Sequence, residues 1–118
     1  MSDQLENLKS PIKKEVAEKI QELDLPLIQK HHVRLLTHCL EIFKNISLDH
    51  DIAFPNDQLL RNWCASEAKK INDIEFTELL YDQMTAAAQK LDSHSQKIGK
   101  DILDFNLDDL VNLVCKNY

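Results

Sequence analysis

Three histidines and a cysteine fall within eleven positions in the stretch KHHVRLLTHCL, residues 30–40. Imidazole and thiolate groups are common zinc ligands, and His titrates near neutral pH, so a metal site, a catalytic site or a pH-sensing edge has to be weighed. On a helix His31 and His38 share a face, but seven residues correspond to a rise of about 10.5 Å, too far for both to ligate one ion. Of the three histidines, only His38 has a ligand-type residue one turn away, Glu41 at i+3.

An ordinary helix is therefore the favoured interpretation of this stretch. In helical projection one edge is polar and faces solvent or a polar neighbour, while His32 and Cys39 fall at the margin of the core. That polar edge consists of His31, Arg34, His38 and Glu41. The alternative is a metal or small-ligand site between helices, with the candidate ligands His31, His38, Glu41 and His50, and with His94 and Asp49 as further members.

The stretch DFNLDD offers a second kind of site. Asp104, Asn106 and Asp108 reproduce the alternating oxygen ligands that open a calcium-binding EF-hand loop. The pattern then fails, because the glycine position is Asp109 and the twelfth position is Cys115. Helix capping explains the same residues, and we prefer it.

Catalytic motifs give little support for an enzyme. The cluster LDHD, residues 48–51, could bind a divalent cation or perform acid–base chemistry, although a solvated loop is the simpler interpretation. A chain with one glycine cannot form a Gly-rich phosphate loop, and neither a GxSxG elbow nor an HExxH motif occurs. We therefore expect no catalytic activity and no cofactor.

The charge pattern indicates what kind of partner to expect. Acids outnumber bases by 20 to 14, and residues 73–118 hold 9 acids and 4 bases, so they carry most of the net charge of −6. A surface of this sign repels phosphate backbones and anionic lipids, which disfavours nucleic acid and membrane surfaces as partners and favours a protein with a basic surface. The residues predicted to meet that partner are Asp82, Asp92, Asp101, Asp104 and Asp108.

Cysteine usage and the amino terminus bear on the compartment. Cys39, Cys64 and Cys115 are odd in number and form no CxxC pair, so we expect reduced, buried thiols. Residues 1–9 form a polar leader without the features of a signal peptide, and no apolar run is long enough to span a bilayer. These observations predict a cytoplasmic protein with one folded domain over residues 10–118.

The elements that must position these side chains are predicted to be helices. Gly occurs once and Pro three times, which leaves few residues for tight hairpin turns, and Leu, Lys, Glu, Gln and Ala favour helices. Apolar residues recur at helical spacing, which predicts an all-α, single-domain bundle of about five helices over residues 10–23, 26–46, 57–71, 73–98 and 107–117. The second helix should be central and the most buried, and the fourth the longest.

Side-chain caps mark the starts of the last three predicted helices, because Asn and Asp side chains can accept hydrogen bonds from the first free backbone N–H groups. The predicted caps are Asn56 or Asp57 for the third helix, Asn72 with Glu75 for the fourth, and Asn106 with Asp109 for the fifth. A loop of about ten residues, SLDHDIAFPND, should join the second and third helices.

Together these patterns favour a non-catalytic protein-protein interaction or regulatory module with an acidic carboxy-terminal surface. A homodimer is compatible with this prediction, because the broadly apolar second and fourth helices could bury a face that one subunit leaves uncovered. The sequence does not identify the partner.

Overall fold

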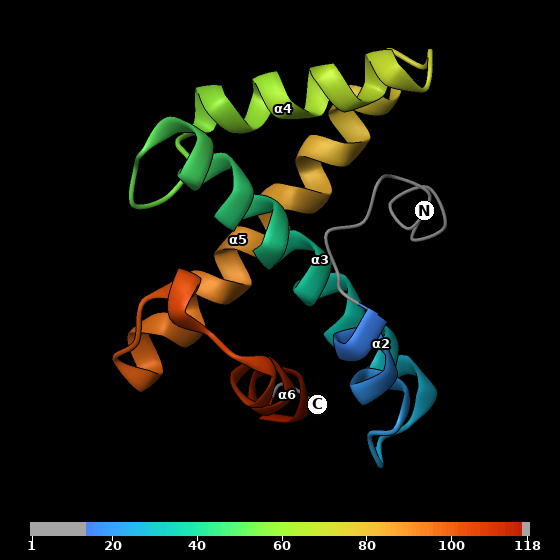
Figure 1. Cartoon of the computed structure of the whole chain (residues 1–118), viewed down its shortest axis with the longest axis vertical. Coiled ribbons are helices and arrows are strands. Elements are labelled where there is room, and N and C mark those ends of the chain that lie inside the picture. The colour runs from blue at the N-terminus through green and yellow to red at the C-terminus, as the bar shows by residue number, and fades with distance from the viewer. Residues whose placement is uncertain (1–13, 117–118) are drawn as a thin grey trace.

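All regular structure in the computed structural model, which describes residues 14–116, is helical (Figure 1). No strand occurs in this part of the chain, so the prediction of an all-α bundle of about five helices is confirmed. The predicted polar leader and the start of the first predicted helix lie outside the described residues. The elements are α2 (Lys14–Gln21), α3 (Leu27–His50), α4 (Asp57–Lys70), α5 (Phe76–Ile98), the 3₁₀ helix η1 (Ile102–Asp104) and α6 (Leu107–Lys116).

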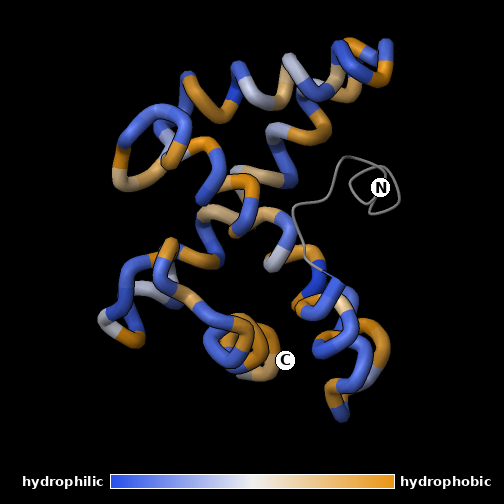
Figure 2. Tube along the Cα trace, in the orientation of Figure 1, coloured by the Kyte–Doolittle hydropathy of each residue, from blue (hydrophilic) through white to orange (hydrophobic). Residues whose placement is uncertain are grey.

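The helix α3 forms the centre of the fold, as predicted. Every other described element packs on α3, and α4 and η1 also pack on α5. In Figure 1 α3 and α5 cross, with α4 beside the start of α5 and α6 below the crossing. One hydrophobic core joins all of these elements through side chains such as Ile20, Phe43, Cys64, Leu80 and Leu113. Each helix carries both hydrophobic and hydrophilic positions, as Figure 2 shows, because each buries one face in this core.

The end of α3 differs from the prediction. The helix runs to His50 instead of residue 46, and with 24 residues it is one residue longer than α5, which was predicted to be the longest. Asp51 ends it in a left-handed conformation (φ 52°), and the N–H of Ile52 bonds the Ser47 carbonyl at 3.0 Å. Ser47 is buried, so the core holds this turn in helical form although its residues are polar.

The connection between α4 and α5 also differs. Asn72 was predicted to cap the fourth helix, but it adopts a left-handed conformation (φ 55°) and terminates α4. Its N–H bonds the Lys69 carbonyl, and the N–H of Asp73 bonds the Ala68 carbonyl, both at 3.0 Å. Asn tolerates this conformation better than most residues, which is why it suits a helix end as well as a helix start. The helix α5 then begins at Phe76 without a side-chain cap.

The other two predicted caps are confirmed. The Asn56 side chain accepts a hydrogen bond from the Leu59 N–H at 2.9 Å. At α6, Asn106 and Asp109 form a reciprocal capping box: each side chain accepts a hydrogen bond from the other residue's backbone N–H, at 3.0 and 2.9 Å. Lys100 donates a further hydrogen bond to Asp109 at 2.7 Å, which ties α6 to the end of α5.

The core of α3 generates a stability prediction with a matched control on the same helix. Leu40 is 2% exposed and Leu48 is 81% exposed. Leu40→Ala should lower the free energy of unfolding by about 2–5 kcal/mol, because it removes buried methyl groups and leaves a cavity. Leu48→Ala should change it by less than about 0.5 kcal/mol. Urea unfolding of both variants measures the difference, and equal effects would contradict the assignment of the core.

The capping box predicts a pH dependence. Burial alone would raise the pKa of Asp109, but the hydrogen bond and charge of Lys100 and the Asn106 N–H lower it below its usual value. A carboxyl with a lowered folded-state pKa stabilises the fold above its unfolded pKa of about 3.9 and loses that contribution as the pH falls through the folded pKa. Asp109→Asn should therefore cost about 1–2 kcal/mol at pH 7 and progressively less below pH 4.

The measurement is urea unfolding of the unchanged chain and of Asp109→Asn, at pH 7 and below pH 4. Asp108→Asn serves as the control, because Asp108 is exposed and lies beside Asp109 in the same helical turn. A cost that is the same at pH 7 and at low pH would show that the Asp109 charge does not contribute.

Candidate functional site

The stretch KHHVR lies in the first half of α3, where it separates two surface grooves. Successive residues on a helix point about 100° apart, so neighbouring side chains can face different surroundings. His31 lines one groove and His32 lines the other. The two histidines that suggested one chemical site therefore belong to two surfaces.

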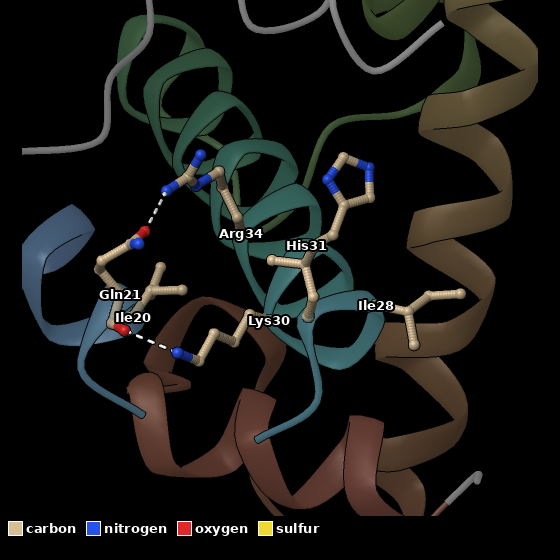
Figure 3. A pocket seen from close by; sticks show the side chains of 7 residues that line it. Ile20, Gln21, Ile28, Lys30, His31 and Arg34 are labelled. Atoms are coloured by element: carbon tan, nitrogen blue, oxygen red, sulfur yellow. Dashed lines mark hydrogen bonds between the residues drawn. The ribbon is translucent and has the colours of Figure 1, made fainter. Parts of the chain in front are cut away.

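The first groove lies between the end of α2 and the start of α3, with a volume of about 520 Å³ (Figure 3). Lys30 donates a hydrogen bond to the Gln21 carbonyl at 2.7 Å, and Arg34 donates to the Gln21 side-chain oxygen at 3.4 Å. These bonds hold the last turn of α2 against α3. Figure 3 shows both cationic side chains reaching toward Gln21 while Ile28 extends the other way. Leu27 and Ile28 are 82% and 62% exposed and form an apolar lip.

The second groove lies between α3, α5 and α6, with a volume of about 820 Å³. Its floor is formed by buried apolar side chains, namely Leu36, Ala87, Leu113 and Val114. Its rim is formed by exposed residues of α5, namely Ala86, Gln89, Lys90, Ser93 and Lys97. His32, Leu35, Gln83 and His94 complete the lining. The groove thus combines an apolar floor with a rim of hydrogen-bond donors.

Both grooves are positively charged, although the chain as a whole carries a net charge of −6. Among the described residues that line them there is no Asp or Glu, whereas Lys30, Arg34, Lys90 and Lys97 all do so. Burial, the charge of Lys90 and then that of His31 lower the pKa of His32. His32 is half-buried, and Lys90 lines the same groove. Negative groups on a partner would find favourable positions here.

The histidines do not converge. His38 and His94 are buried and His50 is exposed at the end of α3. The predicted polar edge is wrong at His38, which faces the interior, while Glu41 at the surface pairs with Lys44 at 3.3 Å. His94 packs edge-on against Phe105, with ring centroids 5.6 Å apart.

The interhelical metal site has no counterpart in the described part of the chain. Residues 14–116 contain no group of three or more His, Cys, Asp or Glu side chains placed to hold a metal ion. The LDHD residues are exposed at the end of α3 instead of lying in a loop, and the DFNLDD residues cap α6.

The five acids predicted to meet a partner are all exposed. Asp101, Asp104 and Asp108 surround η1 and the start of α6, whereas Asp82 and Asp92 lie on α5. Asp82 and Asp92 are ten positions apart, which corresponds to about 15 Å along the helix, so the five do not form one compact patch. None of them forms an ion pair with another residue that the structure describes.

The cysteines are free thiols. Cys39 and Cys64 are buried, as expected, and burial raises the pKa of each to about 12, so neither is a thiolate at neutral pH. Cys115 is exposed, contrary to the expectation that all three are buried. It lies near the end of α6, beyond the residues that face the core.

Sequence reasoning missed the second groove. A row of small, polar and basic side chains on α5 could have indicated it. These residues recur at helical spacing, beside the apolar residues of the same helix, at positions 83, 86, 87, 90, 94 and 97. Lys90 also has no acidic residue at i±3 or i±4, so it lacks the helical ion pair that an exposed lysine often makes.

Within residues 14–116, no helix has both the length and the hydrophobicity needed to cross a bilayer.

Comparison with other proteins identifies the family to which the chain belongs. Neither a curated protein nor a solved structure matches the chain significantly. A family model does match, over residues 12–118, and because it covers nearly the whole sequence the chain belongs to the family described as NDH complex assembly factor CRR9.

Proposed function

We propose that this protein assists the assembly of an NDH complex by binding one of the components of that complex without catalysing a reaction. The observation that carries the proposal is the family match over residues 12–118. An assembly factor must recognise another protein, and such recognition uses surfaces of mixed apolar and polar character. The two grooves along α3 have this character.

The chemistry of the grooves supports binding over catalysis. Their linings hold apolar side chains, glutamines, lysines and histidines, and the lining of the second groove follows about four turns of α5. Such an extended, open lining suits the side chains of a second protein, whereas small-molecule sites are usually more enclosed.

The exposed acids of the carboxy-terminal part provide a second charged surface in this proposal. Asp101, Asp104 and Asp108 would meet basic residues of the same component and would act mainly on the rate of encounter, because exposed charges steer association more than they add affinity. None of these three acids forms an ion pair with another described residue, which supports this role.

One prediction of this proposal concerns the cell from which the chain comes. Removing the gene should lower the amount of fully assembled NDH complex and leave incomplete intermediates, while the finished complex should lack stoichiometric amounts of this chain. Native gel electrophoresis with quantitative mass spectrometry measures both. Normal accumulation of the complex, or a stoichiometric presence of the chain in it, would contradict the proposal.

Another prediction of this proposal concerns the acidic surface formed by Asp101, Asp104 and Asp108. Asp101→Asn, Asp104→Asn and Asp108→Asn combined should slow association with the bound component by about threefold to tenfold at low salt, and the difference should disappear at high salt. Glu15→Gln, Glu18→Gln and Glu22→Gln form the matched control, because these acids are also exposed and their neutralisation changes the net charge equally. Biosensor kinetics give the rates, and equal slowing by the control would refute a role for the carboxy-terminal acids.

A further inference from the structure

We infer that the second groove binds an amphipathic helix of the partner, whose apolar face covers the groove floor and whose carboxylates, spaced two helical turns apart, pair with Lys90 and Lys97. The inference rests on the proposed function for the identity of the partner. The recognition chemistry follows from the groove itself.

The length of the groove fits a helix. Its lining runs along α5 from Gln83 to Lys97, which corresponds to about 21 Å or four turns. Ala86 and Ala87 lie in the first half of this run, and small side chains there let a second helix approach α5 closely. The opposite wall is formed by His32 and Leu35 of α3.

The floor of the groove provides the apolar contact. Leu36, Ala87, Leu113 and Val114 are buried in the core but still reach the groove surface. A helix that sets an apolar stripe into such a groove removes both surfaces from water, which is the usual way an amphipathic helix is recognised. The floor is formed by three helices, so it exists only when α6 is docked.

The rim of the groove determines the charge of the partner. Lys44, Lys70 and Lys100 form ion pairs with acids of this chain. Lys90 and Lys97, in contrast, are exposed and form no ion pair with another described residue. They lie seven residues apart on one face of α5, so their Cα atoms are about 10.5 Å apart along the axis. Carboxylates at i and i+7 of a neighbouring helix match this spacing and would fix its register.

The first groove fits an amphipathic helix less well, because it is shorter and its two cations already donate hydrogen bonds to Gln21. A nucleic acid would be attracted by the lysines of the second groove, but its phosphates would make no favourable contact with the apolar floor. Asp92, which lies between the two lysines in the sequence of α5, would also repel it. An acidic, amphipathic protein helix uses both the floor and the rim.

The test uses the full chain and a synthetic peptide. The probe is a capped, 15-residue helical peptide with a stripe of leucine and alanine, two glutamates seven positions apart, and otherwise uncharged residues. A second peptide has lysines in place of both glutamates. Each is titrated into the ¹⁵N-labelled chain, and backbone amide shifts report both the affinity and the surface that is contacted.

We expect the glutamate peptide to shift the amides of residues that line the second groove, and the lysine peptide to bind at least tenfold more weakly. Lys90→Glu and Lys97→Glu should each weaken binding of the glutamate peptide about fivefold, because each reversal removes an attraction and adds a repulsion. Lys69→Glu is the matched control on α4, exposed and outside the groove, and should leave the affinity unchanged. Equal melting temperatures confirm that all three variants fold.

Four results would overturn the inference: shifts confined to another surface, equal affinity for both peptides, no binding at millimolar peptide, or a short RNA that occupies the groove more tightly than the glutamate peptide. A cellular experiment separates this inference from the proposed function. The unchanged chain and a Lys90→Glu, Lys97→Glu double variant are each returned to cells that lack the gene. If both restore the NDH complex, the groove inference fails and the proposed function stands. If the complex accumulates without the chain, the proposed function fails, and the peptide titration alone decides the groove.

Discussion

The fold depends on the burial of one helix by all the others. From Leu36 to Leu40 every side chain of α3 is buried, because α5 and α6 pack beside α3 while α2 and α4 cover its two ends. Such a helix cannot present a single polar face, which is why Thr37 and His38 are also inside. The first turns of α3, from Leu27 to His32, project beyond this covered region and stay partly or fully exposed. The two grooves lie on either side of this projecting segment, so both are consequences of how the central helix is packed.

Charge is distributed differently at the packed junctions and at the grooves. Where α4 meets α5, Arg61 lies 3.9 Å from the centre of the Tyr81 ring and pairs with Asp57 at 3.3 Å, and the Tyr81 hydroxyl also donates a hydrogen bond to Asp57. The Tyr81 hydrogen bond, together with Arg61, lowers the pKa of Asp57. The charged groups at the α4–α5 junction therefore interact with one another. The grooves concentrate cations without acids in an acidic chain, and this imbalance makes them the better candidates for recognition.

The sequence predicted those features that depend on nearby residues. The caps at Asn56 and Asn106 are recognisable because a side chain and the N–H it bonds are three positions apart. Asn72 was misassigned because the same side chain can start a helix or occupy the left-handed position that ends one, and only the course of the chain after Lys70 decides between them. The end of α3 was misplaced for a related reason: Ser47 is polar in sequence but buried by elements far along the chain.

The second groove could not have been predicted in this way, since its wall on α3, at His32, lies some fifty to eighty positions from its walls on α5 and α6, at Lys90 and Leu113. Its form is consistent with a protein that binds and then releases its partner. Exposed rim pairs contribute only about 0.2–1 kcal/mol each. In the proposed role, binding through such a groove would have moderate affinity and a rate set by charge, so a competing subunit that covers the same helix would displace the chain. In the proposed role the chain leaves before the complex is finished, and an enclosed, fully apolar site would hold its partner too long for that.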